Sequence, residues 1–203
     1  QIVGDVANQG TLAFGRADTS TFGGVISGSG LLAQIGSGTT ILSGNSTFTG
    51  ATDVFAGRLS VNGSIASSSQ VTVHTDGTLG GNGIVGLTQI SGGALSPGNS
   101  IGLLTVQGNL TFSAASSYMV EVSGADADRV NVTGIANLGG ATVRATYDPG
   151  SYVMRRYTIL NAAGGLGGSS FHSEVNTDLP AHFAPSLTYD ANNVYLDMAM
   201  SVA

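Results

Sequence analysis

Pairs of acidic or histidine side chains two positions apart are the first candidates for chemistry in this sequence. Asp126 and Asp128 are separated by one residue, and so are His74 and Asp76. Two carboxylates on one groove are the usual catalytic groups of enzymes that cleave polysaccharides. Asp is also a routine turn residue, because its side chain accepts hydrogen bonds from nearby backbone N–H groups. We favour turns at both places and keep a polysaccharide lyase or hydrolase as an alternative.

Nucleophilic and metal chemistry have weaker support. Serines are so frequent that chance Ser-His-Asp combinations are expected, and no Gly-x-Ser-x-Gly segment lies between a strand and a helix. The three histidines lack a ligand spacing such as His-x-x-x-His. Leu79–Gly83 is similar to glycine-rich calcium repeats, but Ile84 stands where those repeats need an aspartate. We therefore predict no catalytic, cofactor-binding or metal-binding residue, no cofactor, and no enzymatic activity.

The residue composition predicts a folded β protein. The 203 residues include 32 Gly and 4 Pro, with 41% hydrophobic and 9% charged residues, which is the reverse of a disordered chain. Ser, Thr, Asn and Gly must cover the surface, and these residues suit strands and turns better than helices. The net charge of −6, without any Lys, argues against nucleic acids and anionic lipids as partners. Cysteine is absent, so packing and backbone hydrogen bonds must hold the fold.

The sequence contains no candidate membrane helix. No apolar run approaches the roughly 18 residues that such a helix needs. The chain begins with Gln1 instead of Met, and we interpret it as a piece of a longer exported protein. A secretion signal and any membrane anchor are then expected outside it.

Repeated glycine-containing turns predict a solenoid. Short apolar runs such as Leu59–Val61 alternate with turns, and no helical periodicity is convincing. The turns at Gly44, Gly63 and Gly83 are separated by steps of 19 and 20 residues. This period fits one coil of a parallel β-helix, in which neighbouring coils share backbone hydrogen bonds. We predict an all-β, right-handed parallel β-helix of roughly ten coils.

Alternation within the strands predicts a filled interior. In Tyr118–Val122, the side chains of Val120 and Val122 are expected to point inward and that of Glu121 outward. The same pattern recurs in Arg129–Val132 and in Val194–Met198. Because such coils cannot fold singly, their stability must come from stacking.

The last quarter of the sequence departs from the repeat and predicts a C-terminal antiparallel β cap. Ser186–Tyr189 and Val194–Met198 flank a turn at Asp190–Asn193, as in a hairpin. Such a cap would cover the open core and the exposed strand edge. We expect β-helix coils in residues 1–150, and the cap with the start of a linker in residues 151–203. Arg155 and Arg156 are expected to be solvated or to hold a carboxylate such as Glu174 or Asp178.

Five blocks of sequence resemble a known family. Leu42–Thr52 with Ala56–Gly63 resembles the passenger-associated transport repeat of autotransporters. Asp53–Phe55 departs from this repeat, in which a more threonine-rich sequence is common at these positions. The later blocks resemble the autochaperone, or junction, at the C-terminal end of the passengers of these type V secretion proteins. They are Leu95–Val106, Ala127–Gly134, Tyr157–Ala162 and Ser186–Leu196. Together the blocks cover residues of about 40 to 199 in the family's order.

This resemblance implies a secreted or surface-exposed protein that crosses the bacterial outer membrane. It implies a non-catalytic stalk whose residues from about 99 to 199 fold first and template the other coils. Its partners would be its own outer-membrane β-barrel and the assembly machinery of that barrel, and the region itself would be a monomer that does not insert into the membrane. The expected core of this folding nucleus is Phe112, Tyr118, Tyr147, Tyr157, Phe171, Phe183, Tyr189 and Leu196.

Two other functions stay open at this stage. The region could belong to an adhesin that binds a host cell-surface or matrix component, because long polar β-helices display binding loops well. It could also be the polysaccharide enzyme considered above. Binding to host components would support the first alternative, and turnover that is lost on changing Asp126 or Asp128 would support the second.

Overall fold

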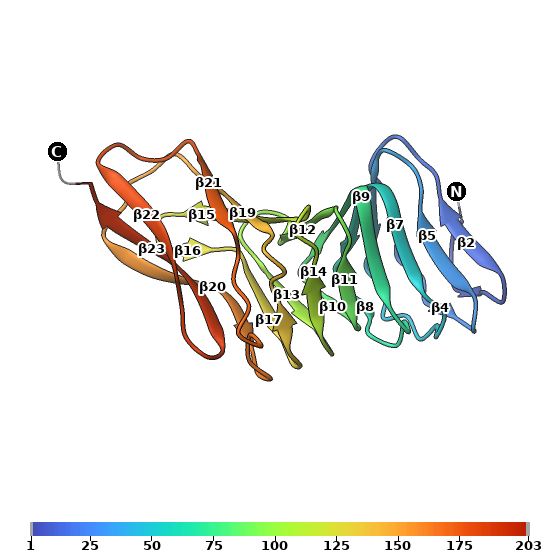
Figure 1. Ribbon diagram of the computed structural model, residues 1–203. Coiled ribbons are helices and arrows are strands. Elements are labelled where there is room, and N and C mark those ends of the chain that lie inside the picture. Colours follow the sequence, from blue (N-terminus) through green and yellow to red (C-terminus); the bar gives the residue numbers. More distant parts are fainter. Residues whose placement is uncertain (1, 202–203) are drawn as a thin grey trace.

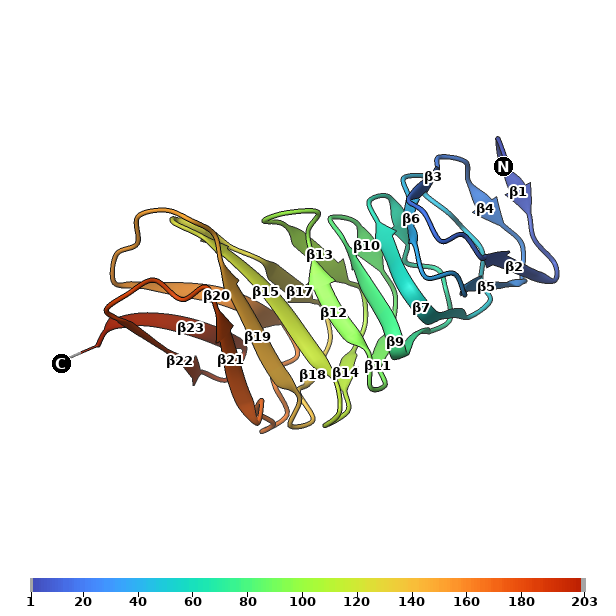
Figure 2. The ribbon, with the colours of Figure 1, turned by 90° about the horizontal axis from the view of Figure 1, so that it is seen from above.

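The computed structural model describes residues 2–201 as an all-β protein. Parallel strands stack in layers along one axis, so that the molecule is an elongated column with β1 and β23 at opposite ends (Figures 1 and 2). The predicted parallel β-helix is confirmed. None of the described residues forms a helix that could span a membrane.

Each coil contributes strands to three faces of the column. The first face contains β1 (Val6–Ala7), β4 (Ile26–Ser27), β8 (Ser64–Ile65), β10 (Ile84–Val85), β13 (Leu103–Val106), β17 (Arg129–Val132) and β20 (Arg155–Ala162). The second face contains β2 (Thr11–Phe14), β5 (Leu31–Gln34), the first parts of β7 (Thr52–Val61) and β9 (Val71–Gly81), β11 (Thr88–Ile90), β14 (Leu110–Phe112) and β18 (Ala136–Asn137). The third face contains β3 (Ser20–Phe22), β6 (Thr39–Leu42), the second parts of β7 and β9, β12 (Ala94–Pro97), β15 (Ser117–Ser123), β19 (Thr142–Tyr147) and β21 (Ser173–Thr177).

The inward side chains form one continuous apolar core. Val54, Val73, Ile90 and Phe112 are register partners in successive coils, and each is at most 2% exposed. On β15 the predicted alternation is confirmed, since alternate residues are buried and Glu121 faces outward. Burying a Val, Ile or Phe side chain contributes about 1.5–3 kcal/mol, and most of this gain requires the neighbouring coil.

The column has eight layers, so the prediction of ten coils is wrong. The third face contains eight strands in succession, from β3 to β21. The first coils keep the predicted period, because Ser64 pairs with Ile84. Later coils are longer: Thr105 pairs with Asn131, and Asn131 pairs with Asn161. The extra residues lie in loops and longer strands, and the turn spacing of the early coils does not reveal them.

The C-terminal strands form the predicted antiparallel cap. β20 pairs in parallel with β17 on one side and antiparallel with β23 (Asn193–Met200) on the other. β22 (Phe183–Tyr189) completes a hairpin with β23. A second, short hairpin joins β15 to β16 (Asp126–Ala127). The division into residues 1–150 and 151–203 stays a prediction, and Ala203 and its neighbour, where a linker was expected to start, lie outside the described residues.

Close contact between coils makes one glycine hard to replace. Gly81 has a φ of +102°, and a Cβ atom there would lie 2.2 Å from the carbonyl oxygen of Val61. We expect Gly81→Ala to lower the free energy of unfolding by at least about 2 kcal/mol in urea denaturation, because both the conformation and the contact oppose a side chain. Gly10→Ala is the matched control, since nothing lies within 4 Å of its Cβ position. Equal stability of the two variants would contradict this packing.

Candidate functional site

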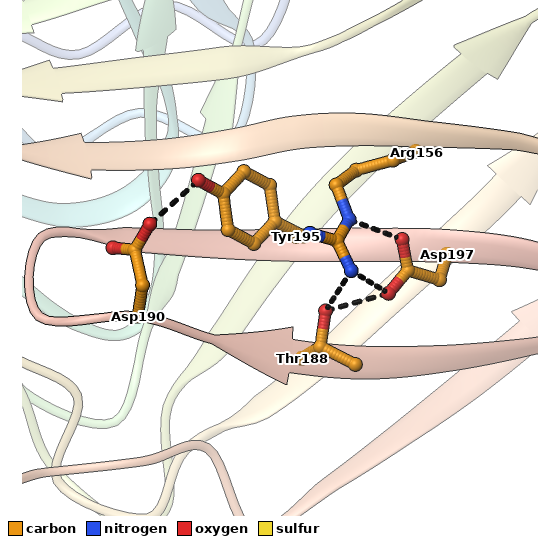
Figure 3. A network of polar contacts seen from close by, with 5 residues as sticks. All are labelled: Arg156, Thr188, Asp190, Tyr195 and Asp197. Carbon is orange, nitrogen blue, oxygen red and sulfur yellow. Dashed lines mark hydrogen bonds and ion pairs between the residues drawn. The ribbon is translucent and has the colours of Figure 1, made fainter.

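An ion pair joins neighbouring strands on the outer face of the cap (Figure 3). Arg156 on β20 holds Asp197 on β23 with two bonds of 2.7 and 2.9 Å, and Thr188 on β22 donates to the same carboxylate at 2.6 Å. The guanidinium also lies 4.6 Å from the ring centre of Tyr195. The hydrogen bond from Arg156 lowers the pKa of Asp197. The network therefore fixes the register of all three cap strands.

Arg156 holds a carboxylate as expected, but this carboxylate is Asp197, so the named partners Glu174 and Asp178 were wrong. Strand register places Arg156 on β20 opposite Asp197 on β23. Glu174 lies on another face, where it pairs with Val143, and Asp178 follows the same strand. Arg155 donates to the carbonyl of Ala125 instead. Sequence spacing identifies the charges but not which strand will lie beside β20.

A tight turn closes the cap hairpin. The carboxylate of Asp190 accepts bonds from the backbone N–H groups of Asn192 and Asn193 at 2.8 and 2.7 Å. It also accepts a bond from the hydroxyl of Tyr195 at 2.7 Å (Figure 3). These donors, Tyr195 first, lower the pKa of Asp190 to about 2. The predicted turn at Asp190–Asn193 is thus held by its own side chains.

Three aromatic rings join the coils to the cap inside the core. The ring centres of Phe112, Tyr118 and Phe171 lie 5.6–6.0 Å apart. The Tyr118 hydroxyl donates to the carbonyl of Ile159 on β20, and burial raises the pKa of Tyr118 well above its usual value. This cluster therefore connects the second and third faces to the first strand of the cap.

Tyrosine hydroxyls satisfy backbone carbonyls around the last coils. Tyr157 donates to the carbonyl of Gly124, and Tyr147 donates to the side chain of Asn176 at 2.8 Å. The Tyr152 hydroxyl lies 2.8 and 2.7 Å from the carbonyl oxygens of Val122 and Asp148, which share its single proton, and its ring packs edge-on against Tyr147. Tyr152 could not be predicted from the sequence, because nothing in its irregular segment indicates an inward-pointing ring.

The structure brings most of the predicted nucleus residues into the core. Phe112, Tyr118, Tyr147, Tyr157, Phe171 and Leu196 are each at most 5% exposed. Phe183 is half-buried and Tyr189 is 38% exposed, because both lie on the edge strand β22. A role of these residues in folding stays a prediction.

Asp126 and Asp128 do not face a common groove, because they line two different pockets. Asp126 is exposed, whereas Asp128 is 3% exposed and accepts bonds of 2.9 Å from the N–H groups of Gly102 and Glu121. His74 contacts Asp53 at 2.9 Å and stacks on Phe55 with ring centres 4.4 Å apart. Within residues 2–201, no three His, Asp or Glu side chains gather as metal ligands.

A loop beside Asp128 is held from several coils at once; we call residues 97–102 the clasp loop. Arg58 on β7 donates to the carbonyls of Ser96 and Gly98 at 3.1 and 2.8 Å. Its guanidinium crosses Gly80 of the intervening coil, where a Cβ would lie 2.2 Å from Nη2. Asn99 in the loop also bonds to Ser60 at 2.8 Å. Arg58 thus connects coils that are two layers apart.

Comparison with known proteins identifies the family. Residues 32–61 match the family described as Passenger-associated-transport-repeat. The chain is 30% identical over 217 residues to an extracellular serine protease of Serratia marcescens, covering 99% of this chain and 20% of that protein. It is 42% identical over 163 residues to the adhesin BmaC autotransporter of Brucella suis biovar 1 (strain 1330), covering 71% of this chain and 5% of that protein. These matches support an autotransporter passenger region.

This chain aligns with only a small part of each of these relatives. It spans a fifth or less of the length of these relatives. As an autotransporter passenger it is secreted or exposed at the cell surface after crossing the outer membrane. The matched repeat begins within β5 and ends with β7, and Leu32, Leu42, Phe48 and Leu59 contribute buried core side chains from it.

Asp128 makes the stability of the passenger region depend on pH. Burial raises the pKa of Asp128 to about 7, although the two N–H donors and Arg58 favour its charged form. Between about pH 4 and pH 7 the unfolded chain loses a proton that the folded protein keeps, so the free energy of unfolding falls as the pH rises. At about 1.4 kcal/mol per pKa unit, the change amounts to a few kcal/mol.

Urea denaturation across this pH range tests the assignment. In Asp128→Asn the fall should largely disappear, whereas the exposed-site control Asp126→Asn should keep it. An unchanged pH profile in Asp128→Asn would refute the role of this carboxyl group.

The clasp loop predicts a specific defect on loss of the Arg58 charge. Arg58→Met keeps much of the apolar stem but leaves the carbonyls of Ser96 and Gly98 without this donor. We expect a loss of about 2–3 kcal/mol in unfolding free energy and faster amide hydrogen exchange in the clasp loop. Arg144→Met is the control, because Arg144 makes one exposed bond, to Ser117. Similar exchange in both variants would contradict the clasp.

Proposed function

We propose that this passenger region is a non-catalytic stalk whose C-terminal part is the folding nucleus for secretion. One observation carries the proposal: β20 belongs to both the last coil and the cap sheet. A cap that forms first therefore offers a strand edge, in register, to the coil that comes before it. Each new coil can then add its strands to an existing template.

Sequence separation favours the cap as the starting point. In the β22–β23 hairpin Tyr189 pairs with Val194, and in the β15–β16 hairpin Val122 pairs with Ala127. The parallel pairs of the coils join residues such as Val6 and Ile26, which are much farther apart along the chain. Local pairs close smaller loops and lose less chain entropy, so they form earlier. Both hairpins lie in the C-terminal half.

The proposal includes the direction of export. Folding outside the membrane would oppose backward movement of the chain, because a stacked coil must unfold before it can return. The partners in this process would be the passenger's own outer-membrane β-barrel and the assembly machinery of that barrel. The passenger region would act as a monomer, since its own hairpin pairs with the outer edge of β20.

A second candidate function is adhesion. The relative with 42% identity is named an adhesin, and it aligns with 71% of this chain. Binding to a host cell-surface or matrix component would be compatible with a stalk role in the same protein. A polysaccharide enzyme has less support, because Asp128 is engaged with backbone N–H groups.

Two matched leucines test the folding nucleus in the full-length precursor. Leu196 on β23 and Leu32 on β5 are both fully buried, so each change to Ala should cost about 2–5 kcal/mol. We expect Leu196→Ala to reduce the protease-resistant passenger at the cell surface several-fold. Leu32→Ala should leave a resistant C-terminal fragment displayed, because the nucleus in that variant is intact.

Protease digestion of intact cells followed by mass spectrometry of the resistant fragments distinguishes the two outcomes. Precursor levels and barrel insertion, measured in parallel, control for expression. Equal loss of folded passenger in both variants would argue against a C-terminal nucleus.

A further inference from the structure

An open polar pocket lies where the first face divides at the cap. β17 and β20 pair only from Val130 with Leu160 to Val132 with Ala162, so the first half of β20 pairs with β23 alone. The resulting gap has a volume of about 330 Å³ and is bordered by the β15–β16 hairpin. Its lining includes Asp126, Arg129, Arg155, Arg156 and Thr158.

Half of the arginines in the chain line this pocket. The sequence has six arginines and no lysine, and Arg129, Arg155 and Arg156 all contribute here. Arg156 is paired with Asp197. Arg129 donates Nε to the neutral side chain of Asn131 at 2.7 Å, and Arg155 donates to a backbone carbonyl. In the described part of the chain, neither Arg129 nor Arg155 forms an ion pair.

These two guanidinium groups have unused donors. A guanidinium carries five N–H donors in a planar fork, and the neutral acceptors occupy only part of each fork. In a protein with a net charge of −6, carboxylates could have neutralised both groups, but only Asp126 among the pocket residues is acidic. Thr158 adds a further polar residue to the lining. Such a setting suits an oxyanion with several acceptor oxygens.

We infer that this pocket binds a single oxyanion group, a phosphate or sulfate monoester, through Arg129 and Arg155. The neutral anchors at Asn131 and Ala125 hold the two side chains in place before the anion enters, which lowers the entropy cost of binding. Asp126 opposes the anion by like-charge repulsion and limits its affinity. The inference stands apart from the folding role, because Arg129 and Arg155 lie outside the aromatic core.

Titration with inorganic phosphate and inorganic sulfate at constant ionic strength tests the site. Followed by NMR or calorimetry on the passenger region, binding should saturate with a Kd of about 1–10 mM. Arg129→Gln and Arg155→Gln should each weaken it about threefold to tenfold, whereas Asp126→Asn should strengthen it about twofold to threefold. Arg144→Gln is the control, since Arg144 also lacks an ion pair in the described region but lines a different pocket.

The outcomes decide the inference in either direction. No saturation up to about 50 mM, or equal binding by Arg155→Gln and Arg144→Gln, would overturn it. Circular dichroism of each variant confirms that the fold is kept, so loss of binding reports on the pocket. A second variant, Arg155→Lys, should retain part of the affinity because it keeps the charge without the fork.

Two further probes identify the source of the anion. Glucose 6-phosphate that binds more tightly than inorganic phosphate, with the same dependence on Arg129 and Arg155, assigns a sugar ester. Co-sedimentation with phosphatidylcholine vesicles that contain phosphatidic acid, lost in both Gln variants, assigns a lipid headgroup. Vesicle or sugar phosphate binding that neither variant reduces would place the anion elsewhere and contradict the site.

Discussion

Backbone pairing between coils is the constraint on which the whole structure depends. A coil of about 20 residues buries half of its strand side chains and has no partner for its ladder hydrogen bonds on its own. A coil is therefore stable only within the stack, and the strands at each end of the stack need another partner for their hydrogen bonds. At the C-terminal end, β20 resolves this by pairing in parallel with β17 and antiparallel with β23. The cap thus pairs the outer edge of the last parallel strand, β20, with an antiparallel hairpin.

Polar interactions of the C-terminal half stabilise this strand pairing, both on the outer face of the cap and in the core. Arg156, Asp197 and Thr188 fix the cap strands on the outer face, while Tyr118 satisfies a carbonyl of β20 in the core. Longer coils leave more loop backbone to satisfy, and the tyrosine hydroxyls of residues 147–157 supply many of these bonds. This explains why all six tyrosines lie at or after Tyr118, whereas the aromatic residues of the short early coils are phenylalanines.

The parts of the structure that repeat locally could be predicted from the sequence. Glycine turns at a 20-residue step predicted the β-helix, alternation in segments such as Tyr118–Val122 predicted the buried side chains, and the turn at Asp190–Asn193 predicted the hairpin. Contacts between distant coils could not be predicted. The partner of Arg156, the burial of Asp128, and the crossing of Arg58 over Gly80 all depend on which strands lie side by side. The predicted number of coils was wrong for the same reason, since the spacing of the early turns does not extend to the longer later coils.

The crossing of Arg58 has an evolutionary consequence. Repeat arrays change length when recombination adds or removes one unit, and the parallel ladder tolerates this because equivalent residues such as Ser64 and Ile84 share one register. Losing the unit that carries Gly80 would bring β7 directly against β12, so the guanidinium would overshoot its two carbonyl acceptors. Gaining a unit would put those acceptors out of reach. The bonds of Arg58 and Ser60 to the segment from Ser96 to Asn99 therefore favour the present number of coils in this stretch.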